Sequence, residues 1–224
     1  MSSNRVALIG LDGSGKSANI SLMKKDSDYK DYDFMWVRWK PTLLKPLYKI
    51  VNKKSSNGGN KTAEKTERVA IKQEYEAKAG IKKRIFKSPF VRKMWLGLAT
   101  LDYFFQFYAK TLKMLLKKRN IIFDRYYLDL FVDQGINFGY SPNRIHREIK
   151  RKEWLFPKMN KIVYIRVNPR TCYERKDDIP NMEYLEKRYE IYEYISKADN
   201  WDIIDGNEPL AEVNKKIKQR IIGD

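Results

Sequence analysis

One segment near the N-terminus limits what this chain can fold into more than any other feature. Residues 10–17 read GLDGSGKS and fit the phosphate-binding pattern G-x-x-x-x-G-K-[ST] at every fixed position. The continuous apolar run at 6–9 is typical of a strand buried on both faces. After the motif, Ile20, Leu22 and Met23 suit the buried side of a helix. The sequence therefore predicts a strand, a tight glycine-rich turn and a helix, in that order.

A turn of this kind binds phosphate because its backbone N–H groups and the start of the following helix both face the anion. Its glycines permit positive φ angles and a close approach of the backbone to the ligand. We expect Lys16 to reach the β- and γ-phosphates and the Ser17 hydroxyl to ligate Mg²⁺. The motif thus predicts a site for ATP or a similar nucleoside triphosphate. The predicted cofactor-binding residues are Gly10, Asp12, Gly13, Ser14, Gly15, Lys16, Ser17 and Ala18.

A second polar cluster follows another apolar run. Residues 121–123 are predicted to form a buried strand, and Asp124 and Arg125 come directly at its C-terminal end. Ligands of open parallel sheets bind beyond that end of the strands. A carboxylate there can hold Mg²⁺ or its water ligands, and a guanidinium can bind a phosphate through two hydrogen bonds. An Asp and Arg that merely cap a helix are the alternative, but the phosphate loop favours a functional pair.

Apolar runs alternate with helical stripes along the rest of the chain. This alternation predicts an α/β fold, in which helices cover both faces of a parallel sheet. Apolar residues at spacings of three and four predict one long helix over 91–118, and residues 135–142 are predicted to form a loop. The five predicted strands lie at about 5–9, 34–37, 121–123, 161–165 and 201–204.

The charge of the chain is large and unevenly distributed. The net charge is +18 over 224 residues, and the stretch from Lys40 to Lys93 holds 16 basic residues against 4 glutamates. We therefore expect a basic helical insertion at about 45–93. Such an excess favours an anionic partner, such as nucleic acid or a membrane surface. A solvated basic surface is the alternative interpretation.

Cysteine usage and hydropathy favour a cytoplasmic protein. Cys172 is the one cysteine, which excludes an internal disulfide. The first predicted strand begins so early that no signal peptide is expected. The apolar part of the predicted helix at 91–118 is short for a bilayer span and contains Asp102 and Gln106. We therefore expect a buried helix and no transmembrane segment.

Together these segments resemble those of thymidylate kinases. The loop at 10–17 looks like theirs in having an acidic residue two places after the first glycine. The sequence DRY at 124–126, followed by Gln134, is similar to a family segment at the same spacing. The sequence WKP at 39–41 resembles the turn after the second strand of the family. The resemblance covers most of the chain except residues 45–93.

The resemblance implies one P-loop kinase domain over 1–224, with a five-stranded parallel sheet and a lid at about 170–184. It implies transfer of the γ-phosphoryl of ATP to dTMP or a related nucleoside monophosphate, with Mg²⁺, by a homodimer. In that family, glycine at the place of Gly13 accompanies a catalytic arginine in the lid, and Arg175 is the candidate. The acceptor phosphate would be held by Arg125 and by Arg38 or Lys40.

The site residues expected on these grounds fall into three sets. The catalytic set is Lys16, Arg125 and Arg175. The acceptor-binding set is Asp12, Arg38, Lys40, Tyr103, Arg125 and Gln134. The metal ligands are Ser17 and Asp124.

The acceptor side departs from the family pattern. The family recognises thymine with an arginine in the long helix, whereas this sequence has no arginine between Lys93 and Lys118. Tyr103 in the matching region would still allow stacking on a base. Losing a hydrogen-bonding group that recognises the substrate costs orders of magnitude in discrimination. Asp129 and Asp133 also replace a serine and a tyrosine of the family segment.

Three functions therefore stay open. The first is a nucleoside-monophosphate kinase acting on dTMP or a relative. The second is the same machinery acting on a sugar- or lipid-linked acceptor. The third is a basic, nucleotide-dependent module that binds nucleic acid or an anionic surface with little turnover. Arg125, Arg175 and the turn at Lys40-Pro41 favour an enzyme, because a binding module would not need an acceptor-side set of this kind.

Overall fold

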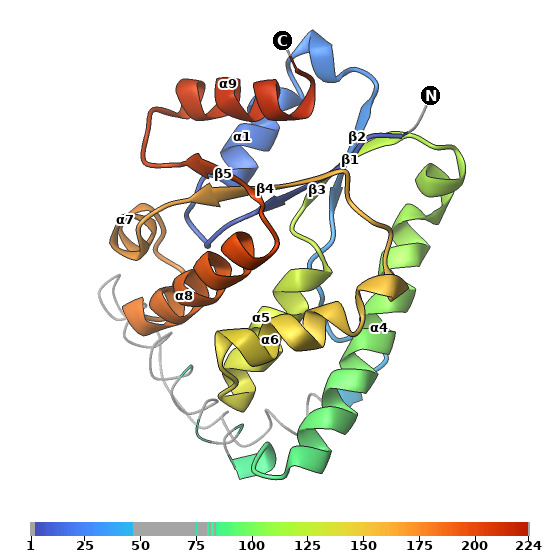
Figure 1. Cartoon of the computed structure of the whole chain (residues 1–224), viewed down its shortest axis with the longest axis vertical. Coiled ribbons are helices and arrows are strands. Elements are labelled where there is room, and N and C mark those ends of the chain that lie inside the picture. The colour runs from blue at the N-terminus through green and yellow to red at the C-terminus, as the bar shows by residue number, and fades with distance from the viewer. Residues whose placement is uncertain (1–2, 47–74, 76–79, 81, 83, 224) are drawn as a thin grey trace, which may run out of the picture.

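Figure 1 shows a computed structural model of the chain, which describes residues 3–46, 75, 80, 82 and 84–223. Most of the predicted basic insertion at 45–93 lies outside the described residues. The strands are β1 (Arg5–Ile9), β2 (Tyr32–Trp36), β3 (Asn120–Asp124), β4 (Lys161–Arg166) and β5 (Asp202–Asp205). The helices are α1 (Lys16–Met23), α4 (Pro89–Leu116), α5 (Tyr127–Phe138), α6 (Pro142–Lys150), α7 (Pro169–Arg175), α8 (Met182–Ala198) and α9 (Leu210–Ile221), with short 3-10 turns η1 (Ser27–Tyr29) and η3 (Glu153–Leu155).

The five strands form one parallel sheet in the order β2-β3-β1-β4-β5. β1 lies at the centre, where Leu8 is paired with Asp124 of β3 and with Val163 of β4. Parallel neighbours need long crossover connections, and helices supply them here. The predicted five-stranded parallel sheet is confirmed, and no strand end differs from the predicted one by more than two residues.

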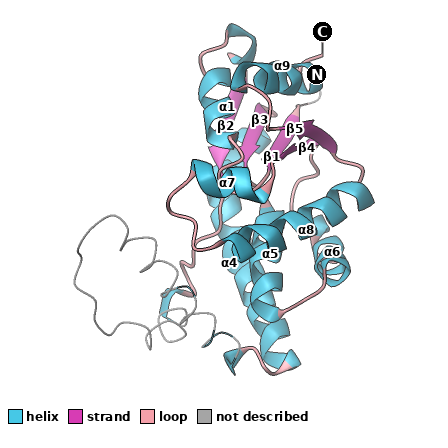
Figure 2. Cartoon of the chain, turned by 90° about the vertical axis from the view of Figure 1, so that its left-hand side faces the viewer, coloured by secondary structure: helices cyan, strands magenta, loops and turns pink. Residues whose placement is uncertain are grey.

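Helices cover both faces of the sheet. α1 and α9 pack together on one face, whereas α4, α5, α6 and α8 lie on the other (Figures 1 and 2). Val6 to Ile9 have no exposed surface, which explains why β1 is apolar at successive positions rather than at alternate ones. The predicted α/β class is confirmed.

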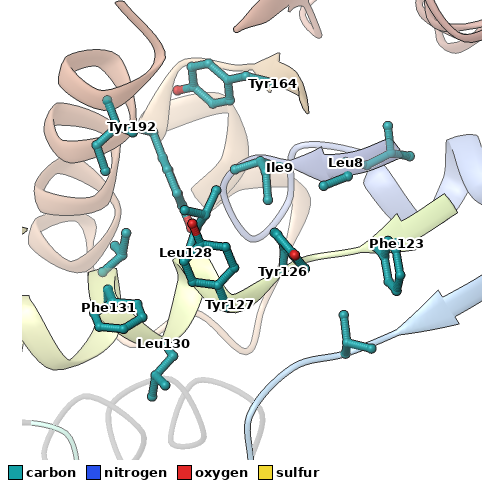
Figure 3. Packing of buried hydrophobic residues seen from close by; sticks show 14 of the residues in the cluster. Leu8, Ile9, Phe123, Tyr126, Tyr127, Leu128, Leu130, Phe131, Tyr164 and Tyr192 are labelled. Carbon is teal, nitrogen blue, oxygen red and sulfur yellow. The ribbon is translucent and has the colours of Figure 1, made fainter. Parts of the chain in front are cut away.

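Aromatic side chains fill much of the space between the sheet and the second helical layer (Figure 3). The ring of Phe123 on β3 lies 5.6 Å from that of Phe107 on α4 and 5.8 Å from that of Tyr126. Tyr127 stacks on Phe156 at 4.7 Å. Burying a large apolar side chain contributes about 1.5–3 kcal/mol. These rings therefore fix α4 and α5 against the strand ends where the polar cluster lies.

Residues 135–138 are helical, so the loop predicted for 135–142 is wrong over its first part. α5 continues to Phe138 and ends at Gly139, whose φ of 67° is left-handed. A Cβ at Gly135 would lie 2.4 Å from the side chain of Ile145 on α6. Gly135 is therefore a close-packing position within a helix rather than a turn residue.

The long helix predicted over 91–118 is α4, and its polar residue Asp102 is buried, with 1% of its surface exposed. Among the residues that the structure describes, no helix combines the length and the apolar character needed to cross a membrane. Cys172 on α7 is a buried free thiol.

Candidate active site

The phosphate loop connects the C-terminal end of β1 to α1. Gly13 and Gly15 both have φ of 87°, in the left-handed region that glycine adopts without strain. Gly15 is the N-cap of α1, and no side chain caps the helix, so the first N–H groups of α1 are available to a ligand. A Cβ at Gly13 would lie 2.5 Å from the carbonyl oxygen of Cys172. The loop thus has the geometry of an anion-binding turn and requires glycine where α7 approaches it.

Lys16 is buried at the start of α1. Its Nζ donates hydrogen bonds to the carbonyl oxygens of Gly10 (2.8 Å) and Leu11 (2.7 Å) and to Ser14 Oγ (3.2 Å). Burial, assisted by the nearby positive charge of Arg125, lowers the pKa of its amine to about 8. A bound polyphosphate would supply the negative charge that favours the ammonium form.

Asp124 ends β3 beside the phosphate loop. Its Oδ1 atom is buried and has no hydrogen-bond partner. Burial raises the pKa of this carboxyl, although the charges of Lys16 and Arg125 and a hydrogen bond from Ser17 act in the opposite direction. A buried polar atom without a partner is costly, and a hard cation would satisfy it. Asp124 and Ser17 therefore fit Mg²⁺.

Mg²⁺ is usually held by one or two protein oxygens together with water and substrate phosphates. Within the described ranges, no group of three or more His, Cys, Asp or Glu side chains is placed to bind a metal.

Arg125 lies between two carboxylates. Its Nη1 donates to Asp129 Oδ2 at 2.8 Å, and its Nη2 pairs with Asp12 Oδ1. The backbone of Arg125 is left-handed, with φ of 70°, which is uncommon for a residue with a side chain. Although burial opposes it, the charges of Asp129 and Asp12 raise the pKa of Arg125 above its usual value. Arg125 is thus a buried, permanently charged residue whose two terminal nitrogens are both paired.

α8 supplies three residues to this network. Tyr184 Oη donates to Asp12 Oδ2 at 3.1 Å, and Tyr192 Oη donates to Asp129 Oδ1. Arg188, one turn from each tyrosine, stacks over the ring of Tyr184 at 4.6 Å and pairs with Asp133. None of these three residues is among the site residues predicted from the sequence. Their spacing of four, which places them on one face of a helix, is the signal that could have identified them.

These elements surround a cavity of about 500 Å³ at the C-terminal ends of β1, β2 and β3. Most of the predicted site residues line it. The lining residues are Asp12, Gly13, Gly15, Lys16, Ser17, Ala18, Trp36, Arg38, Asp124, Arg125, Arg175 and Lys176. Ligands of parallel sheets bind at this edge. Its five cations exceed its two carboxylates, so the cavity suits a polyanion.

A second cavity of about 290 Å³ lies next to the first, and Arg38 lines both. Lys40 and Gln134, predicted to bind the acceptor, line the second cavity together with Tyr184 and Arg188. The two cavities therefore offer adjacent places for a phosphoryl donor and an acceptor. Arg38 lies where they meet.

Asp102 on α4 fixes the turn that carries Arg38 and Lys40. Its carboxylate accepts hydrogen bonds from Trp39 Nε1 (3.2 Å), from the backbone N–H groups of Thr42 (3.0 Å) and Leu43 (3.1 Å), and from Thr42 Oγ1. Although burial opposes it, these donors lower the pKa of Asp102. A carboxylate with this many donors holds the segment after β2 in one conformation.

Tyr103 lies away from both cavities. It is 1% exposed, its hydroxyl donates to the carbonyl oxygen of Val37 at 2.7 Å, and its ring lies 5.4 Å from Phe156. The ring is therefore part of the core under the β2 turn and has no free face for a base. The stacking role expected for Tyr103 does not fit this position.

Arg175 ends α7 and lines the main cavity together with Gly13 and Gly15 of the phosphate loop. Its Nη1 donates to the carbonyl oxygen of Gly206 at 3.2 Å. It lines the main cavity and also a third cavity of about 210 Å³, which Asn19, Leu210 and Val213 help to form. A side chain shared by two cavities that both border the phosphate loop can contact both the phosphates and the remainder of a nucleotide.

The phosphate loop after the central strand and the polar residues beyond the strand ends complete the features of a P-loop kinase fold. Two solved structures share this fold along nearly the whole chain. Deoxyadenosine kinase from M. mycoides with the products dCMP and a flexible dCDP has a TM-score of 0.52 at 18% identity, with 96% of this chain and 97% of that chain covered. Deoxyadenosine kinase from M. mycoides with bound dATP has a TM-score of 0.52 at 16% identity, covering 96% and 98%. Comparisons with family models and with curated proteins gave no match.

Proposed function

We propose that this chain is an ATP-dependent phosphotransferase that moves the γ-phosphoryl of ATP to a nucleoside or a nucleoside monophosphate. One observation carries the proposal. A single cavity is lined by the phosphate loop, by Asp124 and by the cations Arg38, Arg125 and Arg175. Phosphoryl transfer needs two anionic groups held in line with cations around them, and this lining meets that need. The likeness in fold to deoxyadenosine kinase supports the same class of reaction.

In this proposal the chain mainly positions the two substrates and neutralises their negative charge. The acceptor oxygen attacks the γ-phosphorus, the bond to the bridging oxygen breaks, and ADP leaves. When the acceptor is a nucleoside hydroxyl, its proton is released to solvent. Lys16 holds the transferring group, and Arg175 contacts the charge that develops in the transition state. Ser17 and Asp124 would hold Mg²⁺, which when bound neutralises charge on the β- and γ-phosphates.

For the acceptor we propose dTMP or a related nucleotide, bound through Asp12, Arg38, Lys40, Arg125 and Gln134. Tyr103 has no role in this assignment because its ring is buried. Without an arginine on α4 to recognise the base edge, selectivity for thymine should be weak. A sugar- or lipid-linked acceptor is tested by the same assay.

The test is an ADP-release assay with ATP, Mg²⁺ and a panel of nucleosides, nucleoside monophosphates, and sugar- and lipid-linked acceptors. Lys16→Ala should lower kcat on the order of 10²-fold or more, because a charge on the transferring group is lost. Lys25→Ala, which changes an exposed lysine just after α1, should leave kcat unaltered. Wild-type turnover by folded Lys16→Ala would contradict the proposal. ATP binding without turnover on any acceptor would favour a nucleotide-dependent binding module.

We also propose that a second copy of the chain covers an apolar row on α4. Phe90, Leu101, Phe105 and Leu116 are 52–74% exposed, and Met94 and Leu112 continue the row. Gly97 lies in the same row, and a Cβ built there meets nothing within 4 Å in the described part of the chain. A glycine inside a helix costs about 1 kcal/mol relative to alanine, and close approach of a second helix would explain it.

The row is about 39 Å long at 1.5 Å per residue, enough for an interface of ordinary size. Phe105→Lys should convert a dimer to a monomer in sedimentation experiments, because it places a charge in the centre of the row. Lys117→Ala, at the end of the same helix, is the matched control and should remain dimeric. A parent chain that is monomeric at high micromolar concentration would contradict this proposal.

The basic stretch at 45–93 is proposed to attract an anionic partner. Its residues Lys49, Lys53 and Lys54 lie outside the described residues, so the proposal depends on charge alone. Replacing Lys45, Lys49, Lys53 and Lys54 with glutamine should weaken binding to nucleic acid or anionic vesicles, most at low salt. Equal binding by the parent chain and the variant would show that the stretch is only a solvated basic surface.

A further inference from the structure

Asp129 lies behind Arg125, on the side away from the ligand. It is 3% exposed, four residues after Arg125, and is not among the described residues that line the main cavity or the second cavity. Its two oxygens are occupied, one by Arg125 Nη1 at 2.8 Å and the other by the hydroxyl of Tyr192. Asp129 therefore cannot contact a substrate and can act on one only through Arg125.

The charge balance around Arg125 differs from that of a simple phosphate-binding arginine. Arg125 contributes +1 and its two partners, Asp12 and Asp129, contribute −2, so these three side chains together carry −1. The positive charges of Lys16, Arg38 and Arg188 also act on Asp12. Repulsion from Asp12, which lines the same cavity, and from Asp129 behind Arg125 would offset part of the attraction of these cations for a phosphate placed against Arg125. An uncharged hydroxyl would meet no such repulsion and could donate to Asp12.

We propose that Asp129 is a positioning residue that determines acceptor specificity. It fixes the Arg125 side chain and offsets its charge, which weakens the attraction of this point for an acceptor phosphate, so that nucleosides compete with nucleoside monophosphates for the site. Tyr192, donating from α8, keeps the Asp129 carboxylate oriented toward Arg125. This inference rests on the proposed phosphotransferase function, because it concerns which acceptors that site takes.

The test compares acceptors that differ only by a phosphate. Dissociation constants of dTMP and thymidine, and of dAMP and deoxyadenosine, are measured by calorimetry in the presence of Mg²⁺ and a non-hydrolysable ATP analogue. Asp129→Asn removes the charge but keeps the shape. It should tighten dTMP and dAMP binding about tenfold and change the binding of both nucleosides less than about twofold.

The control variants separate the effect of the Asp129 charge from the effect of a disturbed structure. Tyr192→Phe removes a hydrogen bond to Asp129 without removing the charge, so it should not tighten monophosphate binding. Asp129→Ser is a second charge-removing variant for use if the asparagine variant unfolds. Unchanged or weaker dTMP and dAMP binding by a folded charge-removing variant would overturn the proposal, because loss of structure alone can only weaken binding.

The two proposals can fail separately. If the wild-type chain neither binds ATP nor turns over any acceptor, the phosphotransferase function fails. If it turns over acceptors with Lys16 required, but Asp129→Asn leaves the ratio of monophosphate to nucleoside affinity unaltered, only the role of Asp129 fails.

Discussion

The buried amine of Lys16 should make ATP binding dependent on pH in the alkaline range. Burial and the nearby Arg125 charge lower the pKa of Lys16 from 10.5 to about 8 in the free protein. ATP requires the ammonium form, since its phosphates pair with a positive charge. Raising the pH through about 8 deprotonates the amine and removes that form, so ATP affinity should fall as pH rises.

The magnitude follows from the fraction of protein in the binding form. With a pKa of about 8, roughly three quarters of Lys16 is protonated at pH 7.5 and roughly 3% at pH 9.5. The apparent dissociation constant of ATP should therefore rise about 25-fold between these values. The γ-phosphate is already ionised across this range, because the second pKa of a phosphate is near 6. Burial raises the pKa of Cys172 to about 11, so that neighbouring thiol stays neutral.

The assay is calorimetric titration with MgATP at pH 7.5, 8.5 and 9.5, in two buffers of different ionisation enthalpy. Binding should take up almost one proton at pH 9.5 and about a quarter of a proton at pH 7.5. Lys16→Met, which has no titrating amine, should bind ATP weakly and with little pH dependence. An ATP affinity that stays constant up to pH 9.5 in the wild-type chain would refute the reasoning, because the amine would then keep its proton despite burial.

Three further predictions concern the other site residues. Asp124→Asn should raise the Mg²⁺ concentration needed for half-maximal activity about tenfold or more, measured by metal titration at saturating ATP, and an unchanged requirement would exclude it as a ligand. Arg175→Ala should lower kcat far more than it weakens ATP binding, since its contact would form mainly in the transition state; a loss of affinity alone would make it a ground-state ligand. The ratio of kcat/KM for dTMP to that for dUMP, dCMP or dGMP should stay below about 10³, and a larger ratio would reveal a base-recognising group other than the residues named above.

Residues close in sequence were the easiest to place from the sequence. The phosphate loop between 10 and 17 joins an apolar strand to a helix over a few residues, so local rules were enough to predict it. Asp124 and Arg125 were also predicted to lie at the site, because the C-terminal ends of parallel strands share one edge. Gly135 shows where local rules fail. Its turn propensity was outweighed by the contact with Ile145, which only the packing of α5 on α6 creates.

The charge state of the site, by contrast, depends on contacts that no local pattern contains. Asp129 and Tyr192 are 63 residues apart and meet only because α5 and α8 pack on the same face of the sheet. Arg125 was interpreted as a cation free to bind an acceptor phosphate, since its sequence neighbours do not show that both of its terminal nitrogens are paired. A motif predicts which side chains reach a cavity, but the second layer of buried charges behind them determines how much of their charge a substrate meets. Acceptor specificity can therefore change through a residue such as Asp129 while the phosphate-binding motif stays intact.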